Sequence, residues 1–259
     1  MILKDKVVVI SGVGPGLGRK LALLCADEGA KIAIGCRSTD FLEKLRAEVA
    51  AKGAQVVASP CDVAKVEECN RLVSVAAERF GRIDGVVNSA YQYAPSPFEE
   101  ADLDKWVQTM NVTCFGALRI AQAAVPHMKK AGGGSIVNIS TMETRKARPN
   151  DGAYAIPKAA LEAATRQMAL ELGRYNIRVN AALMGWMWGV PVENALKGFA
   201  EKQGVPLQQM IDGVVAGIPI GRMPPDEECA RSVVYFLSDY ASVVTGALLN
   251  VNGGEYMSP

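Results

Sequence analysis

Histidine is nearly absent from this sequence, and its cysteines are scattered. The chain of 259 residues contains a single histidine, His127, and six cysteines without any CxxC spacing. A zinc site therefore lacks its usual ligands, and with 49% hydrophobic residues the chain can form a core without a disulfide framework. Because His127 lies in a segment (126–130) typical of a fraying helix end, we expect neither a metal site nor a Ser-His-Asp or Cys-His hydrolase.

The sequence also lacks an excess of charge and a long apolar run. Its 28 lysines and arginines are balanced by 27 aspartates and glutamates, which gives no general attraction to nucleic acid or to anionic membranes. No apolar run reaches the roughly 18 residues that a membrane span requires, and residues 1–10 lack the features of a signal peptide. We therefore expect a cytoplasmic protein with reduced cysteines, and neither nucleic acid nor membrane as a partner.

What the chain does contain is an alternating order of β-branched runs and helical periods. We expect strands at residues 6–10, 31–35, 55–59, 83–88, 135–140, 177–182 and 248–251, and helices at residues 16–28, 40–52, 66–80, 102–130, 153–175 and 225–237. The strands are nearly continuous apolar runs, as burial on both faces requires. This order predicts a parallel sheet with helices on both faces, in one domain that spans residues 1–259.

The first expected strand leads into a turn rich in glycine. The ordinary G-x-G-x-x-G fingerprint does not fit, because its last glycine would fall on Leu17 or Arg19. Ser11, Gly12, Gly16 and Gly18 instead match the pattern Ser/Thr-G-x-x-x-G-x-G. Glycines allow the backbone to approach a pyrophosphate, while the helix that begins near Leu17 directs its free N–H groups at that anion. The turn is therefore predicted to bind the phosphates of a dinucleotide.

Tyr154 and Lys158 are the strongest candidates for acid–base chemistry. Their spacing of four residues places both side chains on one face of a helix. The pKa of a tyrosine, about 10, must fall by about three units, worth roughly 4 kcal/mol, before the phenol works at neutral pH. A nearby ammonium favours the phenolate. We therefore expect Lys158 to help to lower the pKa of Tyr154, together with a positively charged cofactor ring.

In order and spacing, these motifs resemble those of the classical short-chain dehydrogenase/reductase family, over about residues 5–256. The resemblance implies a seven-stranded, doubly wound Rossmann-type sheet and a homo-oligomer, either a tetramer or a dimer. It implies an NAD(P)-dependent oxidoreductase that interconverts a secondary alcohol and a ketone by hydride transfer. In such an enzyme Tyr154 would be the general acid/base, and Lys158 would also hold the nicotinamide ribose.

Two further catalytic residues follow from the same resemblance. A hydroxyl about 13 positions before the tyrosine is expected to bond the substrate oxygen, which points to Thr141, although serine is usual in the family. Ser140 is the competitor, but neighbouring residues on a strand point to opposite faces, so only one of the two can meet the substrate. Asn111 matches the asparagine that holds a water and passes protons to Lys158.

The resemblance also implies cofactor contacts beyond the glycine turn. Asn88 and Ala90 keep two positions of the family's N-N-A-G motif, whereas Tyr91 replaces its last glycine with an aromatic ring. Asp62 and Val63 match a D-V step whose aspartate contacts the adenine. These four matching residues are therefore expected to bind the cofactor.

The two ends of the cofactor are expected to meet different residues. Near the adenosine, Cys36 replaces the acid that would hold the 2′-hydroxyl of NAD, and Arg37 follows it. A guanidinium matches the geometry of a phosphate, so NADP(H) is expected, with NAD(H) as the alternative. Near the nicotinamide, Gly189 replaces the threonine that usually bonds the carboxamide, which leaves the backbone N–H of Met187 as the expected anchor.

Residues 186–224, after the sixth expected strand, are expected to form a lid over the substrate. The segment contains two tryptophans and, further on, Met210 and Ile211. Large aromatic and thioether side chains suit a bulky, apolar, uncharged substrate; a core or a subunit contact is the alternative use of such residues. The expected substrate contacts are Tyr91, Thr141, Tyr154 and Trp186.

Two other functions remain open from the sequence. A β-ketoacyl carrier-protein reductase would need a basic docking patch for its acidic carrier, for which Arg145, Lys146 and Arg148 are the candidates. A cofactor-binding sensor without turnover would need neither Tyr154 nor Lys158, so their presence argues against it. The leading prediction is an oxidoreductase that acts on a small-molecule alcohol or ketone.

Overall fold

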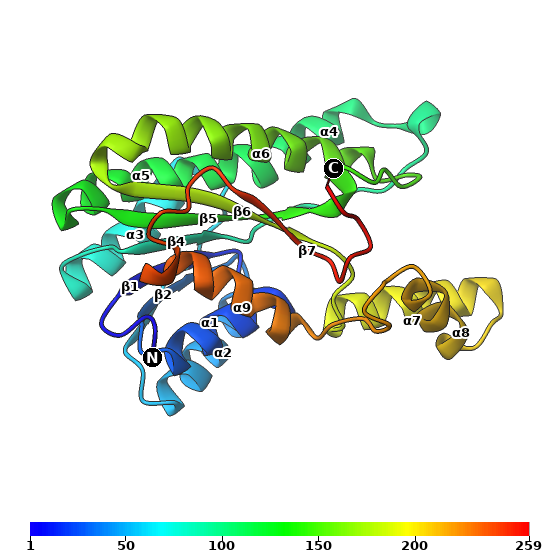
Figure 1. Cartoon of the computed structure of the whole chain (residues 1–259), viewed down its shortest axis with the longest axis horizontal. Helices are drawn as coiled ribbons and strands as arrows, with labels where there is room; N and C mark the ends of the chain where they lie inside the picture. The colour runs from blue at the N-terminus through cyan, green and yellow to red at the C-terminus, as the bar shows by residue number, and fades with distance from the viewer. Residues whose placement is uncertain (259) are drawn as a thin grey trace.

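The computed structural model describes residues 1–258 and forms a three-layer α/β fold (Figure 1). Its strands are β1 (Val7–Ser11), β2 (Lys31–Gly35), β3 (Val56–Ala58), β4 (Gly85–Asn88), β5 (Gly134–Thr141), β6 (Ile177–Met184) and β7 (Leu248–Val251). They form one parallel sheet in the order β3-β2-β1-β4-β5-β6-β7. The predicted doubly wound, seven-stranded Rossmann-type sheet is therefore confirmed.

Helices cover both faces of this sheet. On one face lie α1 (Leu17–Asp27), α2 (Thr39–Ala51) and α9 (Asp226–Leu237); on the other lie α3 (Val66–Phe80), α4 (Leu103–Met110), α5 (Gly116–Ala131) and α6 (Gly152–Leu172) (Figure 1). Each face has its own apolar core: Leu21, Leu45 and Val233 are buried in the first, and Leu72 and Ile120 in the second. No helix within residues 1–258 is long and apolar enough to cross a membrane.

Two expectations about helices need correction. The single helix expected over 102–130 is interrupted by a π-helical turn, η2 (Asn111–Phe115), between α4 and α5. The expected lid segment contains two helices that the apolar pattern did not indicate, α7 (Val190–Gln203) and α8 (Leu207–Val215), which project together from one end of the molecule (Figure 1). Short 3₁₀ turns occur at η1 (Phe98–Glu100), η3 (Met142–Thr144), η4 (Gly173–Tyr175) and η5 (Asp239–Ala241).

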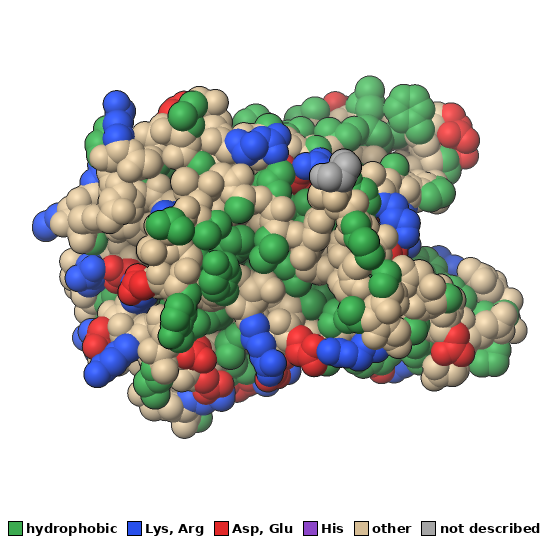
Figure 2. Space-filling view, viewed as in Figure 1, with side chains coloured by type: hydrophobic (Ala, Val, Ile, Leu, Met, Phe, Trp, Pro, Cys, Tyr) green, Lys and Arg blue, Asp and Glu red, His purple; other side chains and the backbone are tan. Residues whose placement is uncertain are grey.

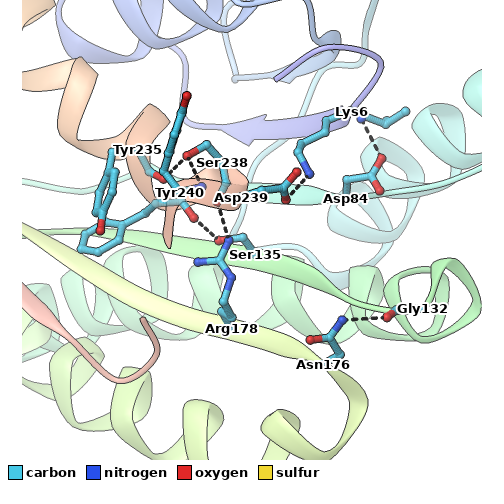
Figure 3. A network of polar contacts seen from close by, with 12 residues as sticks. Lys6, Asp84, Gly132, Ser135, Asn176, Arg178, Tyr235, Ser238, Asp239 and Tyr240 are labelled. Atoms are coloured by element: carbon cyan, nitrogen blue, oxygen red, sulfur yellow. Dashed lines mark hydrogen bonds and ion pairs between the residues drawn. The ribbon is translucent and has the colours of Figure 1, made fainter. Parts of the chain in front are cut away.

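The amino ends of the strands are joined by structural polar contacts (Figure 3). Ser135 donates a hydrogen bond to the carbonyl oxygen of Phe236 (2.7 Å), and Arg178 donates to the carbonyl oxygen that follows α9 (3.1 Å). Lys6 forms an ion pair with Asp239 (2.8 Å). These contacts fasten α9 and η5 to this edge, whereas ligands bind at the opposite, carboxyl edge of such sheets.

Candidate active site

The glycine turn between β1 and α1 leaves no room for a side chain at Gly12 or Gly18. Gly12 has a φ of +78°, and a Cβ on this residue would lie 2.2 Å from the backbone nitrogen of Ala90. A Cβ on Gly18 would lie 2.8 Å from the Cα of Val13. Gly16, the N-cap of α1, provides no side-chain cap, so the first N–H groups of the helix stay available to an anion. The turn therefore fits the pyrophosphate of a dinucleotide.

A cavity of about 320 Å³ opens beside this turn, at the carboxyl edge of the sheet. Ten of the predicted site residues line it: Gly12, Gly16, Leu17, Gly18, Tyr91, Thr141, Tyr154, Lys158, Trp186 and Met187. Figure 2 shows the molecule hollowed at this end, between the part that carries α4 and the part that carries α7 and α8. The structure thus brings together the glycine turn, the candidate acid–base pair and the start of the expected lid.

Tyr154 lies in the first turn of α6 and faces Thr141 at the end of β5. Both side chains line the cavity, and the hydroxyl of Thr141 is close enough to the phenol to lower the pKa of Tyr154. The rings of Tyr91 and Tyr93 both contact the ring of Tyr154 edge-on, with 5.7 Å between centroids in each pair. The phenol is therefore fixed beside the hydroxyl that was predicted to bind the substrate oxygen.

The charges around Tyr154 differ from those expected. Burial raises the pKa of its phenol above the usual value, and the nearby Glu143 carboxylate adds to the rise, whereas the hydrogen bond with Thr141 lowers the pKa. Burial also lowers the pKa of the Lys158 ammonium to about 7. The expected lowering of the tyrosine pKa by Lys158 is therefore not found among the chain's own groups. A positive nicotinamide ring is the remaining charge that would favour the phenolate.

Lys158 is held inside the protein, one helical turn after Tyr154. Its side chain is buried, and its Nζ donates a hydrogen bond to the carbonyl oxygen of Ile139 in β5. The same atom lies 5.8 Å from the ring centroids of Tyr91 and Tyr154. Lys158 also lines the cavity, so its ammonium is placed to contact a group bound there.

Ser140 points to the opposite side of β5 from Thr141. Its hydroxyl donates to Oε1 of the buried Glu162 (2.7 Å), which also accepts from the hydroxyl of Thr144 (2.7 Å). Arg145 forms an ion pair with the other oxygen of Glu162 (2.7 Å). Both residues line the cavity, but Thr141 faces Tyr154, whereas the hydroxyl of Ser140 is bonded to Glu162.

Six predicted site residues do not line the cavity: Arg37, Asp62, Val63, Asn88, Ala90 and Asn111. The side chain of Asn88 is buried within the sheet, where it bonds Ser11 (3.3 Å) and Asn138 (2.9 Å). Ala90 packs directly on Gly12. Asn88 and Ala90 thus support the glycine turn by packing against Ser11 and Gly12. A direct contact of either residue with a cofactor stays a prediction.

Three residues expected at the adenosine end lie further along the carboxyl edge. Arg37 is exposed and follows β2, whereas Asp62 and Val63 follow β3. Asp62 accepts a hydrogen bond from the backbone N–H of Ala64 (3.0 Å), which fixes the local turn. Because β1, β2 and β3 are neighbours in the sheet, an extended ligand on the glycine turn can run toward Arg37 and Asp62.

Asn111 begins the π turn η2, a feature that is frequent at functional sites. Its side-chain oxygen accepts a hydrogen bond from Arg119 (2.6 Å), and its carbonyl oxygen accepts another (3.1 Å). Arg119 also donates to the carbonyl oxygen of Val63 (3.2 Å). No motif indicated this arginine, which occupies both oxygens of Asn111; the predicted proton path through Asn111 stays a prediction.

The expected lid is a helix pair with a small core of its own. Leu196, Ile218 and Met223 are buried at its centre, and Met210 and Ile211 pack against them. Met210 and Ile211 pack in this core and do not line the cavity, which fits the alternative role in a core. The lid residues that do line the cavity are Trp186, Met187, Gly189, Pro191 and Val192.

Gly189 stands where a threonine was expected from the family resemblance. A Cβ there would lie 2.5 Å from Oδ2 of Asp226, at the start of α9. The close approach of Asp226 therefore explains why this position has no side chain.

Charged residues between β5 and α6 form a part of the site that the sequence did not reveal. Glu143 and Arg148 line the cavity, and Asp151 is buried behind them. Arg148 was expected only as a docking cation, and no motif marked the two acids. No group of three His, Cys, Asp or Glu side chains within residues 1–258 is placed to hold a metal ion.

Known proteins match this chain over nearly its whole length. A family model described as enoyl-(acyl carrier protein) reductase matches residues 12–255. The trans-4-hydroxycyclohexanecarboxylate dehydrogenase of Sinomonas cyclohexanicum is 34% identical over 257 residues, with 97% of this chain and 93% of that protein covered. The 7alpha-hydroxysteroid dehydrogenase of Escherichia coli K12 is 30% identical over 252 residues, with 97% and 94% covered. The crystal structure of L-sorbose reductase from Gluconobacter frateurii, complexed with NADPH and L-sorbose, has a TM-score of 0.95 at 28% identity and covers 100% of both chains.

Proposed function

Because the chain belongs to the short-chain dehydrogenase/reductase family of NAD(P)-dependent oxidoreductases that act on CH–OH groups, we propose that it interconverts a secondary alcohol and a ketone at this cavity. The observation that carries the proposal is the contact between Tyr154 and Thr141, with Lys158 beneath them and the glycine turn in the same cavity. A nicotinamide cofactor, when bound, supplies the acceptor or donor of the hydride.

The chain's own groups would handle the substrate oxygen and its proton. Thr141 hydrogen-bonds the oxygen, and Tyr154 removes the hydroxyl proton of an alcohol or returns one to a ketone. Lys158 holds the nicotinamide ribose, and Asn111 with a water replaces the proton of Tyr154. The proposed cofactor contacts are Gly12, Gly16, Leu17, Gly18, Arg37, Asp62, Val63, Asn88, Ala90, Tyr154, Lys158 and Met187.

We propose NADP(H) as the preferred cofactor, with Arg37 as the residue that binds its 2′-phosphate. The guanidinium is exposed beyond β2, and no carboxylate within residues 1–258 is paired with it. Loss of a hydrogen bond to a charged group costs about 1.5–3 kcal/mol. Replacement Arg37→Ala should therefore weaken NADPH binding at least about tenfold and leave NADH binding nearly unchanged, as measured by fluorescence titration. Equal losses for both cofactors, or tighter NADH binding by the parent protein, would contradict this assignment.

A bulky, mainly apolar substrate is the proposed ligand. Met142, Met184, Trp186 and Val192 form the apolar wall of the cavity, opposite Tyr91. Two matched relatives act, by their names, on hydroxyl groups of carbocyclic compounds. The carrier-protein alternative lacks a free basic patch, since its three candidate cations Arg145, Lys146 and Arg148 each form an ion pair with a carboxylate of the chain.

The proposal is tested by following cofactor absorbance at 340 nm across a panel of alcohols and ketones. Tyr154→Phe should reduce turnover by about 10²–10⁴ because it deletes the acid–base group, while NADPH binding stays nearly intact. The intact binding serves as the control for folding. A variant that keeps more than about a tenth of the parent's activity would show that Tyr154 is not the acid–base residue.

A further inference from the structure

The cavity has one polar end, formed by an ion pair. Glu143 and Arg148 both line the cavity, and Arg148 Nη1 donates a hydrogen bond to Oε1 of Glu143 (3.3 Å). The guanidinium of Arg148 also lies over the ring of Trp186, 4.5 Å from its centroid. These contacts hold both charged side chains in place at the wall, next to the apolar surface of the lid.

A second acid lies behind this ion pair. Asp151 is buried and accepts a hydrogen bond from the hydroxyl of Tyr93 (2.5 Å). Oε2 of Glu143 is buried, and no donor within residues 1–258 reaches it. Burial, followed by the charge of Asp151, raises the pKa of Glu143 to about 7, and Arg148 opposes that rise. Glu143 and Arg148 therefore give the cavity an end that can both accept and donate hydrogen bonds.

The polar end is also close to the reacting centre. The backbone N–H of Glu143 donates to Oγ1 of Thr141 (3.3 Å), and the carboxylate of Glu143 is near enough to raise the pKa of Tyr154. A substrate whose oxygen lies between Thr141 and Tyr154 would place the neighbouring part of its carbon skeleton beside Glu143. A polar group at that position can meet the carboxyl group of Glu143 and the guanidinium of Arg148, which both line the cavity.

Three kinds of substrate group would interact differently with this end. An apolar group would displace water from the Glu143–Arg148 pair without replacing its hydrogen bonds, which is unfavourable. A carboxylate would meet two acids and one arginine that is already paired. An uncharged hydroxyl can donate to Glu143 and accept from Arg148.

On the basis of the proposed function, we propose that Glu143 determines specificity by accepting a hydrogen bond from a second, uncharged hydroxyl of the substrate, close to the carbon that is oxidised or reduced. The ligand class is therefore a diol, or the matching hydroxyketone, whose remaining carbon skeleton packs against Trp186 and the methionines of the cavity. Glu143 has no part in the hydride or proton transfer itself.

Two matched pairs of alcohols test the inference: cyclohexanol with cyclohexane-1,2-diol, and butan-2-ol with butane-2,3-diol. The parent protein should show a kcat/KM at least about tenfold higher for the diol of each pair, the fold-change expected of one hydrogen bond to a charged group. Glu143→Gln, which keeps an acceptor but removes the charge, should reduce this ratio several-fold. Glu143→Met should bring it close to one through a rise in KM for the diol; the effect of the lost charge on Tyr154 acts on both members of a pair and cancels from the ratio.

Glu255→Gln is the matched control. The side chain of Glu255 is as deeply buried as that of Glu143 (8% against 11% exposed) and is also paired with a cation, Lys146 (3.0 Å), but Glu255 does not line the cavity. Its replacement should leave the diol preference unchanged. Circular dichroism and NADPH binding confirm that each variant is folded. If Glu143→Met does not fold, the inference is tested by the ratio of kcat/KM between diol and simple alcohol in Glu143→Gln alone.

The outcomes separate this inference from the proposed function. The inference is overturned if the parent enzyme oxidises both members of each pair equally well. It is also overturned if the parent oxidises other alcohols but neither diol. Both results leave the oxidoreductase assignment intact. A diol preference that survives both Glu143 replacements overturns it as well. A parent that binds NADPH but turns over no alcohol or ketone at all overturns the proposed function and, with it, the inference.

Discussion

At the end of β5, two adjacent hydroxyl residues lie on opposite sides of the sheet and have different partners. Thr141 faces Tyr154, and Ser140 is bonded to Glu162. Thr141→Val removes a donor to the substrate oxygen and should lower kcat by about 10²–10³, whereas Thr141→Ser should keep most of the activity. Ser140→Ala should change kcat little but lower the free energy of unfolding by about 1–3 kcal/mol, because the buried Glu162 loses a partner. Steady-state kinetics and urea unfolding check both, and a larger kcat loss in Ser140→Ala would reverse the assignment.

The burial of Lys158 predicts how the free energy of unfolding depends on pH. Its pKa is about 7 in the folded protein against 10.5 without burial. Between these values the unfolded chain carries a proton that the folded chain has lost, so this group makes stability rise with pH over that window. The cost of burying the charge is fully present below about pH 7. Lys158→Met should therefore stabilise the cofactor-free protein most below pH 7, with a gain that shrinks toward pH 10.5.

Urea unfolding at pH 6 and pH 10 measures this difference. Lys44→Met, at an exposed position of α2, is the control and should show no change between the two pH values. An equal effect of Lys158→Met at both pH values would show that its ammonium is not desolvated in the folded protein.

The residues that the sequence could predict are those with a fixed spacing along one element. Tyr154 and Lys158 lie one turn apart at the start of α6, so their relative position follows from helix geometry, whereas Thr141, on another element, was indicated by the family resemblance. Glu143 and Asp151 stand in the irregular segment between these elements, where spacing does not determine which side chains meet. The raised pKa of Tyr154 was missed for the same reason, since it depends on burial and on Glu143.

At the scale of elements, the β1–α1 turn is the most constrained connection of the site. Gly12→Ala would place a Cβ at a positive φ and against the backbone of Ala90, and should lower the free energy of unfolding by about 3–5 kcal/mol. Gly14 in the same turn has open space around it and no positive φ. Gly14→Ala should therefore stay within about 0.5 kcal/mol of the parent. Unfolding by urea without cofactor gives the comparison, and equal losses in the two variants would contradict the close packing of the turn.

The elements that the sequence indicated well are those with strong periodicity. The apolar runs of β2 and β7 and the amphipathic α3 have the expected bounds. The π turn η2 was not visible because it inserts only one extra residue per turn into a pattern that stays helical. The lid helices α7 and α8 bury little against the sheet and form a separate small core, so their apolar residues resembled a pocket lining.

At the scale of the whole molecule, two apolar surfaces lack a partner within residues 1–258. Leu103, Val107, Phe115 and Ile156 are exposed around an apolar depression between α4 and α6. Tyr240, Val243 and Leu249 are exposed on another face, where Figure 2 shows apolar side chains around β7 and the end of α9. Contiguous apolar surface of this kind is typical of subunit contacts. On this basis we propose the homo-oligomer that the family resemblance implies, a dimer if one face is used and a tetramer if both are.

Charge placed on the α4–α6 face tests this assembly. Val107 and Ile156 lie on the two helices and are 67% and 48% exposed, so Val107→Glu with Ile156→Glu should leave the fold of each subunit intact. Burying two carboxylates in an apolar contact without partners is unfavourable, so the double variant should have a lower mass than the parent in light scattering after gel filtration. Val66→Glu, an equally exposed apolar site on α3, should keep the parent's mass. If the parent already has the mass of one chain, or if the double variant keeps the parent's mass, the α4–α6 face is not a subunit contact, and its apolar residues must serve another purpose.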